Sequence, residues 1–428
     1  MTGILDIYWR LISEEFDGLR HAMGGSVSEL FESVAVYAFI MSMLWTSSSL
    51  IYWVRSQWRK PATMAPSRSY SVLIPFHGEP LAALNSARSP ATVSPAPEEI
   101  ILIDDGSPVG VPPGTVLPPR TRLLRLDRRR GKAGALNEAL RTVYSEIVVY
   151  LDADTTARST DWRQMLASFD DSSLGAITGK IWPLAPGSLI GRFQQLDYLA
   201  VITVIKAAET VWGGLLTVSG AVVAYRLEAL RAVGGWREDK AAEDIDISWR
   251  MQCNGWRLAF DNTWKCAVEM APTAVALWRQ RRRWSTGLGQ AMRDYGVSAL
   301  VHGARHLPVV VITIANIIWI SSVLFIAGNM AFVLAAGGWT ELSWVWDSNL
   351  LLATEVGFGL FFCQFIVAMM VDGRTWRNHI ALVPFLPFYA IYFWLILVTS
   401  FVVGFPNGFI RKRLGIWQPT VRQRQLDQ

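Results

Sequence analysis

The sequence predicts an α/β domain with a mostly parallel sheet, flanked by membrane-spanning α-helices. Three observations carry this prediction. Short apolar runs alternate with helical stretches in the middle of the chain. Uncharged apolar runs long enough to cross a bilayer lie on both sides of that region. Hydrophobic residues make up 51% of the 428 residues and charged residues only 18%, which is too apolar for a purely soluble protein.

The N-terminal part of the chain predicts one membrane span. Residues 1–30 are rich in acids, show no h-region of a signal peptide, and are expected on the non-cytoplasmic side. Residues 31–55 contain a long uncharged run and are predicted to form a transmembrane helix. Arg55, Arg59 and Lys60 follow that run. The positive-inside rule therefore assigns residues 55 onward to the cytoplasm.

Residues 68–275 predict a cytoplasmic α/β domain. Three short apolar runs, SVLIP (71–75), EIILIDDGS (99–107) and EIVVYLDAD (146–154), have the composition of buried strands. The stretch KAGALNEALRTVY (132–144) has a helical pattern, and strands that alternate with helices indicate a mostly parallel sheet. In such sheets ligands bind beyond the carboxyl ends of the strands. The acidic residues of IDDGS and LDAD lie at the ends of the second and third runs, where a ligand is expected.

Three further segments follow the domain. Residues 276–306 are rich in arginine, and we expect them to form amphipathic helices at the membrane interface. Residues 308–404 predict C-terminal transmembrane helices, and residues 405–428 form a basic tail. The candidate spans within 308–404 are 308–336, 350–371 and 380–404.

The last of these spans has two interpretations. A full crossing would put the basic RKR (411–413) outside the cell, against the positive-inside rule. Alternatively, Pro384 and Pro387 mark a broken or re-entrant segment.

Charge and cysteine usage exclude several classes of protein. The net charge of +5 and pI near 9.1 would suit a nucleic-acid binder, but the basic residues cluster beside apolar runs. We therefore expect a lipid bilayer as the partner and no nucleic acid. Three cysteines are too few and too scattered for a disulfide framework, and the five histidines lack metal-ligand spacing.

The sequence offers one candidate metal site. Asp152 and Asp154 form a D-x-D after the apolar run IVVYL, and residues i and i+2 of an extended segment point to the same side. Two such carboxylates suit Mg²⁺ or Mn²⁺, which prefer oxygen ligands and leave room for substrate phosphates. The alternative is a pair of surface acids. The stretch RRRGK (128–132) lacks the earlier glycine that a G-x-x-x-x-G-K phosphate-binding loop needs before Gly131 and Lys132, so a P-loop nucleotidase is excluded.

Two other clusters lie further along the chain. Lys132, in a glycine-flanked turn, could meet a diphosphate or simply begin a helix. Glu243 and Asp244 place two negative charges at consecutive positions. They could bind a cation, one of them could accept a proton, or they could simply begin a helix, where acids suit the helix dipole.

The stretch RQRRRWSTG (279–287) holds a Q-x-x-R-W motif made of Gln280, Arg283 and Trp284. Its arginines could hold a diphosphate and its tryptophan could stack on a sugar ring. The alternative is a basic interfacial helix that binds anionic lipid headgroups.

Taken together and in this order, these motifs resemble those of the processive, membrane-embedded glycosyltransferases of family 2, which include cellulose, chitin and hyaluronan synthases. Within them the chain is most similar to bacterial poly-β-1,6-N-acetyl-D-glucosamine synthases. Residues 217–256, with TVSGAVVAYRLEALRAVGGW and EDIDISWRMQCNGW, carry most of the resemblance. FIMSMLW (39–45) and QFIVAMM (364–370) extend it into the membrane segments.

The resemblance implies a GT-A fold, UDP-N-acetylglucosamine as donor, and inverting transfer to a growing polysaccharide. It also implies a multi-pass protein of the bacterial inner membrane, export coupled to synthesis for a biofilm matrix, and a small membrane partner that helps bind cyclic di-GMP. The residue roles it implies are donor binding by Pro75, Asp105, Lys132 and Asp152, metal binding by Asp152 and Asp154, base catalysis by Asp244 beside Glu243, and acceptor or diphosphate binding by Gln280, Arg283 and Trp284.

Three positions depart from the family's pattern. Ala242 stands where a threonine is usual, and His77 and Gly78 replace commoner residues at the start of the donor site.

Other functions would share some of these motifs. A hyaluronan, chitin or cellulose type of synthase would share all of them. A lipid-linked sugar transferase would need the D-x-D but not Q-x-x-R-W. A non-catalytic cyclic-dinucleotide receptor could use Arg279 and Arg283 but would lack a D-x-S-x-x-G.

Overall fold

The computed structural model describes residues 27–59, 68–184, 188–301, 306–335, 348–372 and 380–410. The predictions for residues 1–26, for the loops around 336–347 and 373–379, and for the tail beyond 410 lie outside the described residues.

One eight-stranded sheet forms the centre of the domain in the described part of the chain, in the order β3-β2-β1-β4-β7-β6-β8-β5. β1 pairs in parallel with β2 and β4, β2 with β3, and β6 with β8, which confirms the predicted mostly parallel sheet. β7 and β5 run antiparallel to their neighbours. The strands are β1 (Tyr70–Phe76), β2 (Glu99–Asp104), β3 (Thr121–Arg125), β4 (Ile147–Leu151), β5 (Thr155–Ala157), β6 (Leu174–Leu184), β7 (Val222–Arg226) and β8 (Arg257–Glu269).

Both faces of this sheet are buried, which explains why its central strands are continuous apolar runs. In β1, Val72 and Ile74 belong to the hydrophobic core on one face and Leu73 to the core on the other, as the strand period of two requires. The covering helices are short: α3 (Pro80–Arg88), α4 (Gly131–Leu140), α5 (Arg163–Ala167), α8 (Leu227–Ala232) and α9 (Glu243–Cys253), with single turns η1 (Pro90–Thr92) and η2 (Ser168–Asp170).

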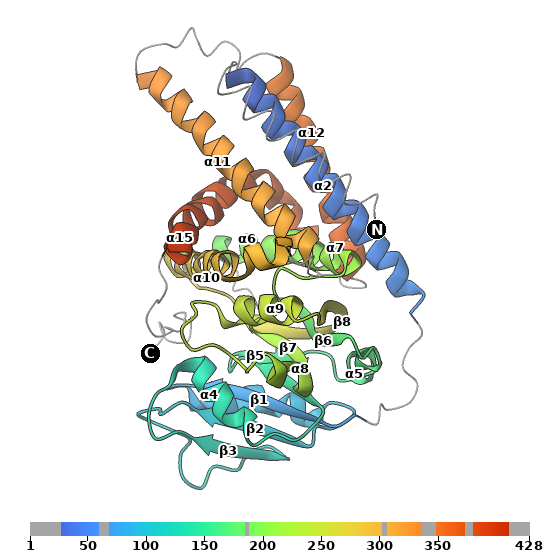
Figure 1. The fold of residues 1–428 in the computed structure, drawn as a ribbon, viewed down its shortest axis with the longest axis vertical. Coiled ribbons are helices and arrows are strands. Elements are labelled where there is room, and N and C mark those ends of the chain that lie inside the picture. Colours follow the sequence, from blue (N-terminus) through green and yellow to red (C-terminus); the bar gives the residue numbers. More distant parts are fainter. Residues whose placement is uncertain are drawn as a thin grey trace.

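A layer of helices lies between the sheet and the long apolar helices (Figure 1). It contains α6 (Leu189–Leu196), the π-helical η3 (Asp197–Thr203), α7 (Val204–Trp212) and α10 (Ala274–Val301). Within residues 276–301 the expected interface helices are a single helix, α10. The predicted α/β domain, residues 68–275, includes α6, η3 and α7. In the structure they pack against apolar segments, since α6 and η3 share a core with α12 and the 380–398 region.

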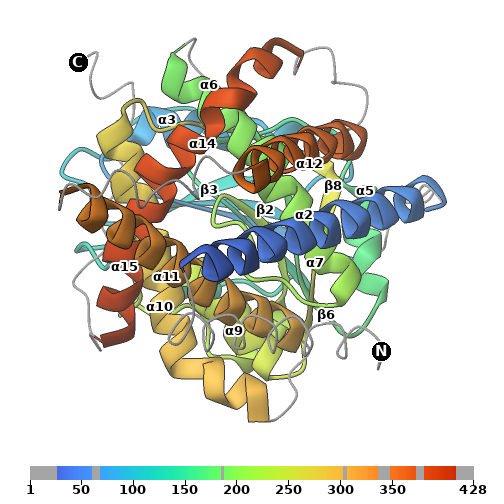
Figure 2. The same cartoon turned by 90° about the horizontal axis from the view of Figure 1, so that it is seen from above.

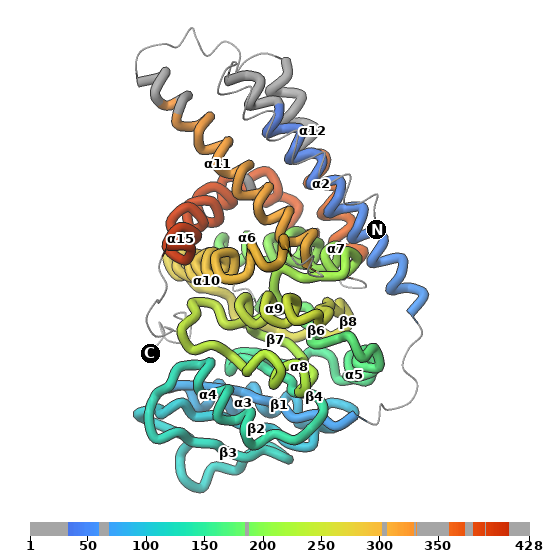
Figure 3. The backbone as a smooth tube through the Cα atoms, viewed as in Figure 1, coloured from blue at the N-terminus to red at the C-terminus, as the bar shows by residue number. Residues whose placement is uncertain are grey.

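Three helices extend from this layer away from the sheet (Figure 3). They are α2 (Val27–Gln57), α11 (Leu307–Ala335) and α12 (Ser348–Asp372), and α2 packs against both α7 and α12. Among the described residues, three segments are long and apolar enough to cross a membrane: Ser33–Gln57, Leu307–Gly328 and Phe393–Ile410. Gly359–Asp372 is a shorter apolar helix in the same part of the chain.

The segment predicted as a span at 380–404 is broken, as its prolines suggested. It consists of the 3₁₀ segment η5 (Ile380–Phe388), α14 (Tyr389–Tyr392), the π-helical η6 (Phe393–Val398) and α15 (Thr399–Ile410). Pro384 and Pro387 both lie in η5, where a proline removes a helical hydrogen bond.

Helix α15 lies directly against α10 (Figures 1 and 2). Glycines allow this close approach of the two backbones. A Cβ atom added at Gly289 would collide with the carbonyl oxygen of Phe405, and one added at Gly408 would collide with that of Thr286. The helix that carries the Q-x-x-R-W motif is thus tightly joined to the C-terminal apolar segment.

Candidate active site

A cavity of about 450 Å³ joins the end of the sheet to the membrane-facing segments. Its lining includes the acids that follow β4 and begin α9, the motif of α10, and apolar side chains of η6 and α15. The structure brings most of the predicted residues together here: Lys132, Asp152, Asp154, Glu243, Asp244, Gln280, Arg283 and Trp284.

On the side of the cavity formed by the α/β domain, Lys132 pairs with two of the carboxylates. Its Nζ lies 2.7 Å from Glu243 Oε1 and 3.0 Å from Asp152 Oδ1, and it donates a hydrogen bond to the Gly220 carbonyl at 3.2 Å. Burial alone would lower the pKa of Lys132, but the two carboxylates outweigh it and raise this pKa above its ordinary value. Lys132 is therefore a cation at neutral pH.

The two carboxylates of the D-x-D line the same cavity, as their spacing predicted. Asp152 follows β4 and also accepts a hydrogen bond from the Tyr150 hydroxyl. Among the described residues, no group of three or more His, Cys, Asp or Glu side chains is arranged to hold a metal ion. Two hard oxygen donors facing a cavity fit a cation such as Mg²⁺ or Mn²⁺ only if the substrate's phosphates complete its coordination.

Glu243 and Asp244 are neighbours in the chain, but their pKa values are shifted in opposite directions. Burial would raise the pKa of Glu243, but Lys132 and Arg283 outweigh it and lower this pKa. Burial and the neighbouring Glu243 raise the pKa of Asp244. Asp244 Oδ2 accepts a hydrogen bond from the Gly220 N–H at 3.0 Å, which orients the carboxylate. Of the two acids, Asp244 is the one with the higher affinity for a proton.

The third acid of this run, Asp246, does not line the cavity. It pairs with Arg250 at 2.8 Å and accepts a hydrogen bond from the Tyr295 hydroxyl at 2.7 Å. The Arg250 pair lies within α9 and balances the charge of Asp246, while the Tyr295 hydrogen bond joins α9 to α10.

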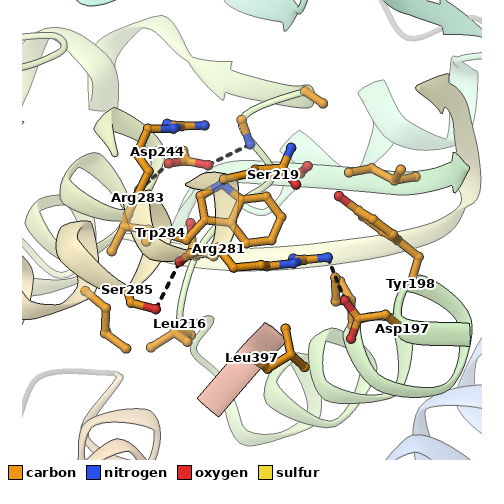
Figure 4. Close-up of a pocket in the computed structure, with 18 of the residues that line it drawn as sticks. Asp197, Tyr198, Leu216, Ser219, Asp244, Arg281, Arg283, Trp284, Ser285 and Leu397 are labelled. Carbon is orange, nitrogen blue, oxygen red and sulfur yellow. Dashed lines mark hydrogen bonds and ion pairs between the residues drawn. The ribbon is translucent and has the colours of Figure 1, made fainter. Parts of the chain in front are cut away.

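The motif of α10 presents a stacked pair to the cavity (Figure 4). The Trp284 ring lies over the guanidinium of Arg281, 4.1 Å from its Cζ to the ring centroid. Arg281 is buried and donates to Asp197 Oδ2 at 2.6 Å, while the Tyr389 hydroxyl donates to Asp197 Oδ1 at 2.9 Å. Arg283 donates to the Ala241 carbonyl at 3.2 Å, beside the acidic pair. Sequence reasoning missed the roles of Arg281 and Asp197, because the two residues are 84 positions apart.

Asp105 and Pro75, the remaining predicted donor contacts, do not line this cavity. Both Asp105 carboxylate oxygens accept backbone hydrogen bonds at the start of α4, from Arg130 N at 2.7 Å and Gly131 N at 2.9 Å. Pro75 is buried within β1 beside Ile103 of β2. Their contact with a nucleotide stays a prediction.

Two further charged residues of the cavity, Lys206 and Glu209, were also missed. The available signal was their presence, three residues apart, in the otherwise apolar stretch around α7.

The family model described as "Glycosyl transferase family group 2" matches residues 147–403. A poly-beta-1,6-N-acetyl-D-glucosamine synthase of Staphylococcus epidermidis is 25% identical over 397 residues, which is 90% of this chain and 96% of the relative. The Staphylococcus aureus synthase of the same name is 25% identical over 401 residues, again covering 90% and 96%.

A solved structure with a similar fold is the mannosyltransferase PcManGT from Pyrobaculum calidifontis in complex with GDP-Man and Mn²⁺. It has a TM-score of 0.54 and 21% sequence identity, and the match covers 80% of this chain and 98% of that one. This likeness confirms the GT-A fold that the resemblance implied.

Proposed function

The chain belongs to glycosyl transferase family group 2 and is a hexosyltransferase, and from this premise we propose that it polymerises N-acetylglucosamine from UDP-N-acetylglucosamine into a β-1,6-linked chain. The observation that carries the proposal is a cavity whose lining contains both the carboxylates at the sheet's edge and apolar side chains of η6 and α15. The staphylococcal relatives named for this activity, similar over 90% of the chain, support the donor and the linkage.

In the proposed reaction, a hydroxyl group of the acceptor attacks the anomeric carbon of the donor sugar. The bond from that carbon to the UDP oxygen breaks, and the configuration inverts. Asp244 takes the proton of the attacking hydroxyl as general base, a role that suits the carboxylate with the raised pKa. Glu243, whose pKa is lowered, keeps its charge and its ion pair with Lys132.

The leaving UDP requires positive charge near its diphosphate. Lys132 and Arg283 supply fixed cations at the cavity wall. Asp152 and Asp154 would hold a divalent cation, which when bound would neutralise negative charge on the diphosphate. The Mn²⁺ in the fold neighbour is consistent with such a cation. Gln280 and Trp284 would contact the acceptor.

We further propose that the domain faces the cytoplasm of a bacterial inner membrane and that the polymer leaves along the apolar side of the cavity. Phe393, Leu397 and Phe401 line that side, so the product would pass from the transfer site directly to the membrane segments. Processive elongation, coupled export and regulation through a small membrane partner that binds cyclic di-GMP are part of this proposal.

Product analysis tests the proposal. Membranes containing the protein are supplied with radiolabelled UDP-N-acetylglucosamine and Mg²⁺ or Mn²⁺, and the product is digested separately with a β-1,6-specific hexosaminidase and with chitinase. Polymer degraded only by the first enzyme is expected. Polymer degraded only by chitinase would move the protein to a β-1,4 synthase, and absence of polymer with and without cyclic di-GMP would contradict the proposed donor. Membranes with the Asp244→Asn protein are the matched control.

A further inference from the structure

Two charged side chains of α7 line the cavity and have no part in the transfer step described above. Lys206 is only 9% exposed and Glu209 only 3% exposed. They lie three residues apart and therefore on one face of the helix. Their neighbours on the cavity wall, Ile202 and Ile205, are apolar. Charged groups in such surroundings are costly unless they have hydrogen-bonding partners.

Each of the two groups is only partly satisfied by the protein. Lys206 Nζ donates to the Thr217 carbonyl, and Glu209 Oε2 accepts from the Leu216 N–H at 3.0 Å. An ammonium carries three donors and a carboxylate about four acceptor sites. No ion pair within 4.0 Å joins Lys206 to Glu209 in the described part of the chain. A donor and an acceptor thus remain available toward the cavity.

Lys206 and Glu209 lie near the proposed base, where the acceptor would bind. Leu216 and Thr217, which it contacts, precede Gly220, whose N–H binds the base Asp244. Leu216 lies on the far side of the Trp284 ring from Asp244 (Figure 4). A buried donor, a buried acceptor and an aromatic ring in one apolar cavity match the features of a site for a neutral, hydroxyl-rich ligand. The anionic diphosphate suits the other end, where Lys132 and Arg283 lie.

We propose that Lys206 and Glu209 form a subsite for a neutral sugar unit of the acceptor chain, on the membrane side of Asp244. Lys206 donates to an acetamido or hydroxyl oxygen of that unit, and Glu209 accepts from one of its hydroxyl groups. This inference rests on the proposed function, because it takes the acceptor to be a chain of N-acetylglucosamine. Burial lowers the pKa of Lys206 and raises that of Glu209, as expected for charges held in such a cavity.

The competing explanation is structural, since the same pair holds the 216–217 backbone near the base. Conservative variants separate the two roles. In Glu209→Gln, the amide oxygen can still accept from the Leu216 N–H, and in Lys206→Gln the amide N–H₂ can still donate to the Thr217 carbonyl. Both variants keep a group that can make the backbone contact, and both remove the charge offered to a ligand. Glu228→Gln, on the exposed side of α8, is the matched control.

The test uses the full chain in lipid nanodiscs, with a short β-1,6-linked N-acetylglucosamine oligosaccharide as probe in the presence of saturating UDP. Calorimetry is expected to show that Glu209→Gln and Lys206→Gln each weaken oligosaccharide binding about tenfold or more, because each loses a charge-assisted hydrogen bond. UDP affinity and melting temperature should match those of the wild type and of Glu228→Gln.

Three results would overturn the inference. Variants that bind the oligosaccharide as well as the wild type would remove the pair from the acceptor site. Parallel losses of UDP affinity and melting temperature would assign it a structural role. A wild-type protein that makes β-1,6 polymer but does not bind the oligosaccharide would overturn the subsite alone. Failure of the product assay would instead overturn the proposed function, and the subsite with it.

Discussion

Neutralising the two adjacent carboxylates one at a time should affect stability differently: Glu243→Gln should lower the free energy of unfolding, and Asp244→Asn should leave it equal or raise it. Asp244→Asn removes a charge whose ionisation is disfavoured by burial and by Glu243. Glu243→Gln removes a charge whose ionisation is favoured by Lys132 and Arg283. The substitutions are of similar size and lie at consecutive positions, so each serves as the control for the other.

The contacts set the magnitudes. Glu243→Gln breaks an ion pair of 2.7 Å between two side chains that are 7% and 10% exposed. Removing one partner of a buried pair costs about 3–5 kcal/mol. Lys132 keeps Asp152 at 3.0 Å, so we expect about 3 kcal/mol, equivalent to a melting temperature lower by about 6–12 °C. In Asp244→Asn the amide oxygen still accepts from Gly220, and the free energy of unfolding should stay equal or rise by about 1 kcal/mol.

The pH dependence follows from the signs of the shifts. The raised pKa of Asp244 means that its ionised form lowers stability at neutral pH, and this cost vanishes as the pH falls toward the unfolded value of about 3.9. The lowered pKa of Glu243 means that its ionised form adds stability above the unfolded value of about 4.3, and this is lost as the pH falls through the folded pKa. Both variants should therefore approach the wild type in acid.

The assay is thermal unfolding in nanodiscs across a pH series from 7 down to about 3, together with polymer synthesis at pH 7. Asp244→Asn should lose about 10²–10⁴-fold in polymer synthesis while binding UDP normally. A melting temperature lowered as much by Asp244→Asn as by Glu243→Gln would refute the electrostatic argument. Undiminished polymer yield in Asp244→Asn would remove it as the base.

Four further outcomes are expected. Trp284→Ala should shorten the polymer on gels more than it weakens UDP binding in a titration, whereas equal losses would indicate misfolding. Asp197→Asn should lower the free energy of unfolding by about 3 kcal/mol, because it leaves the buried Arg281 cation without its carboxylate; an unchanged melting temperature would contradict this. Gly408→Ala should destabilise the α10–α15 contact by about 1–3 kcal/mol, while Gly328→Ala, with no neighbouring atom within 4 Å, should be neutral in the same melting assay. Chelation with EDTA should weaken UDP binding, and Mg²⁺ or Mn²⁺ should restore it; UDP affinity independent of metal would count against the D-x-D site.

Local features were predictable from the sequence. The apolar runs that became β1, β2 and β4 could be found because a buried strand is a short, nearly continuous hydrophobic segment. Asp152 and Asp154 could be paired because residues two apart at a strand end lie close together whatever the rest of the fold. The break at Pro384 and Pro387 could be predicted because proline disrupts a helix locally. The grouping of the distant motifs into one site came from the family resemblance.

Other features were decided only by the tertiary structure. The partner of Arg281, the assignment of α6 and α7 to the interface layer, and the place of Lys206 and Glu209 on the cavity wall all depend on contacts between segments far apart in the chain. The lowered pKa of Glu243 depends on Lys132, which is more than a hundred residues away, and the raised pKa of Asp244 depends on its burial in the folded chain and on Glu243. The sequence by itself determined β1, β2, β4, α4 and the positions of the long apolar runs, because hydrophobic periodicity is local. Pairing, burial and charge coupling needed the folded chain, because they depend on distances that only packing sets.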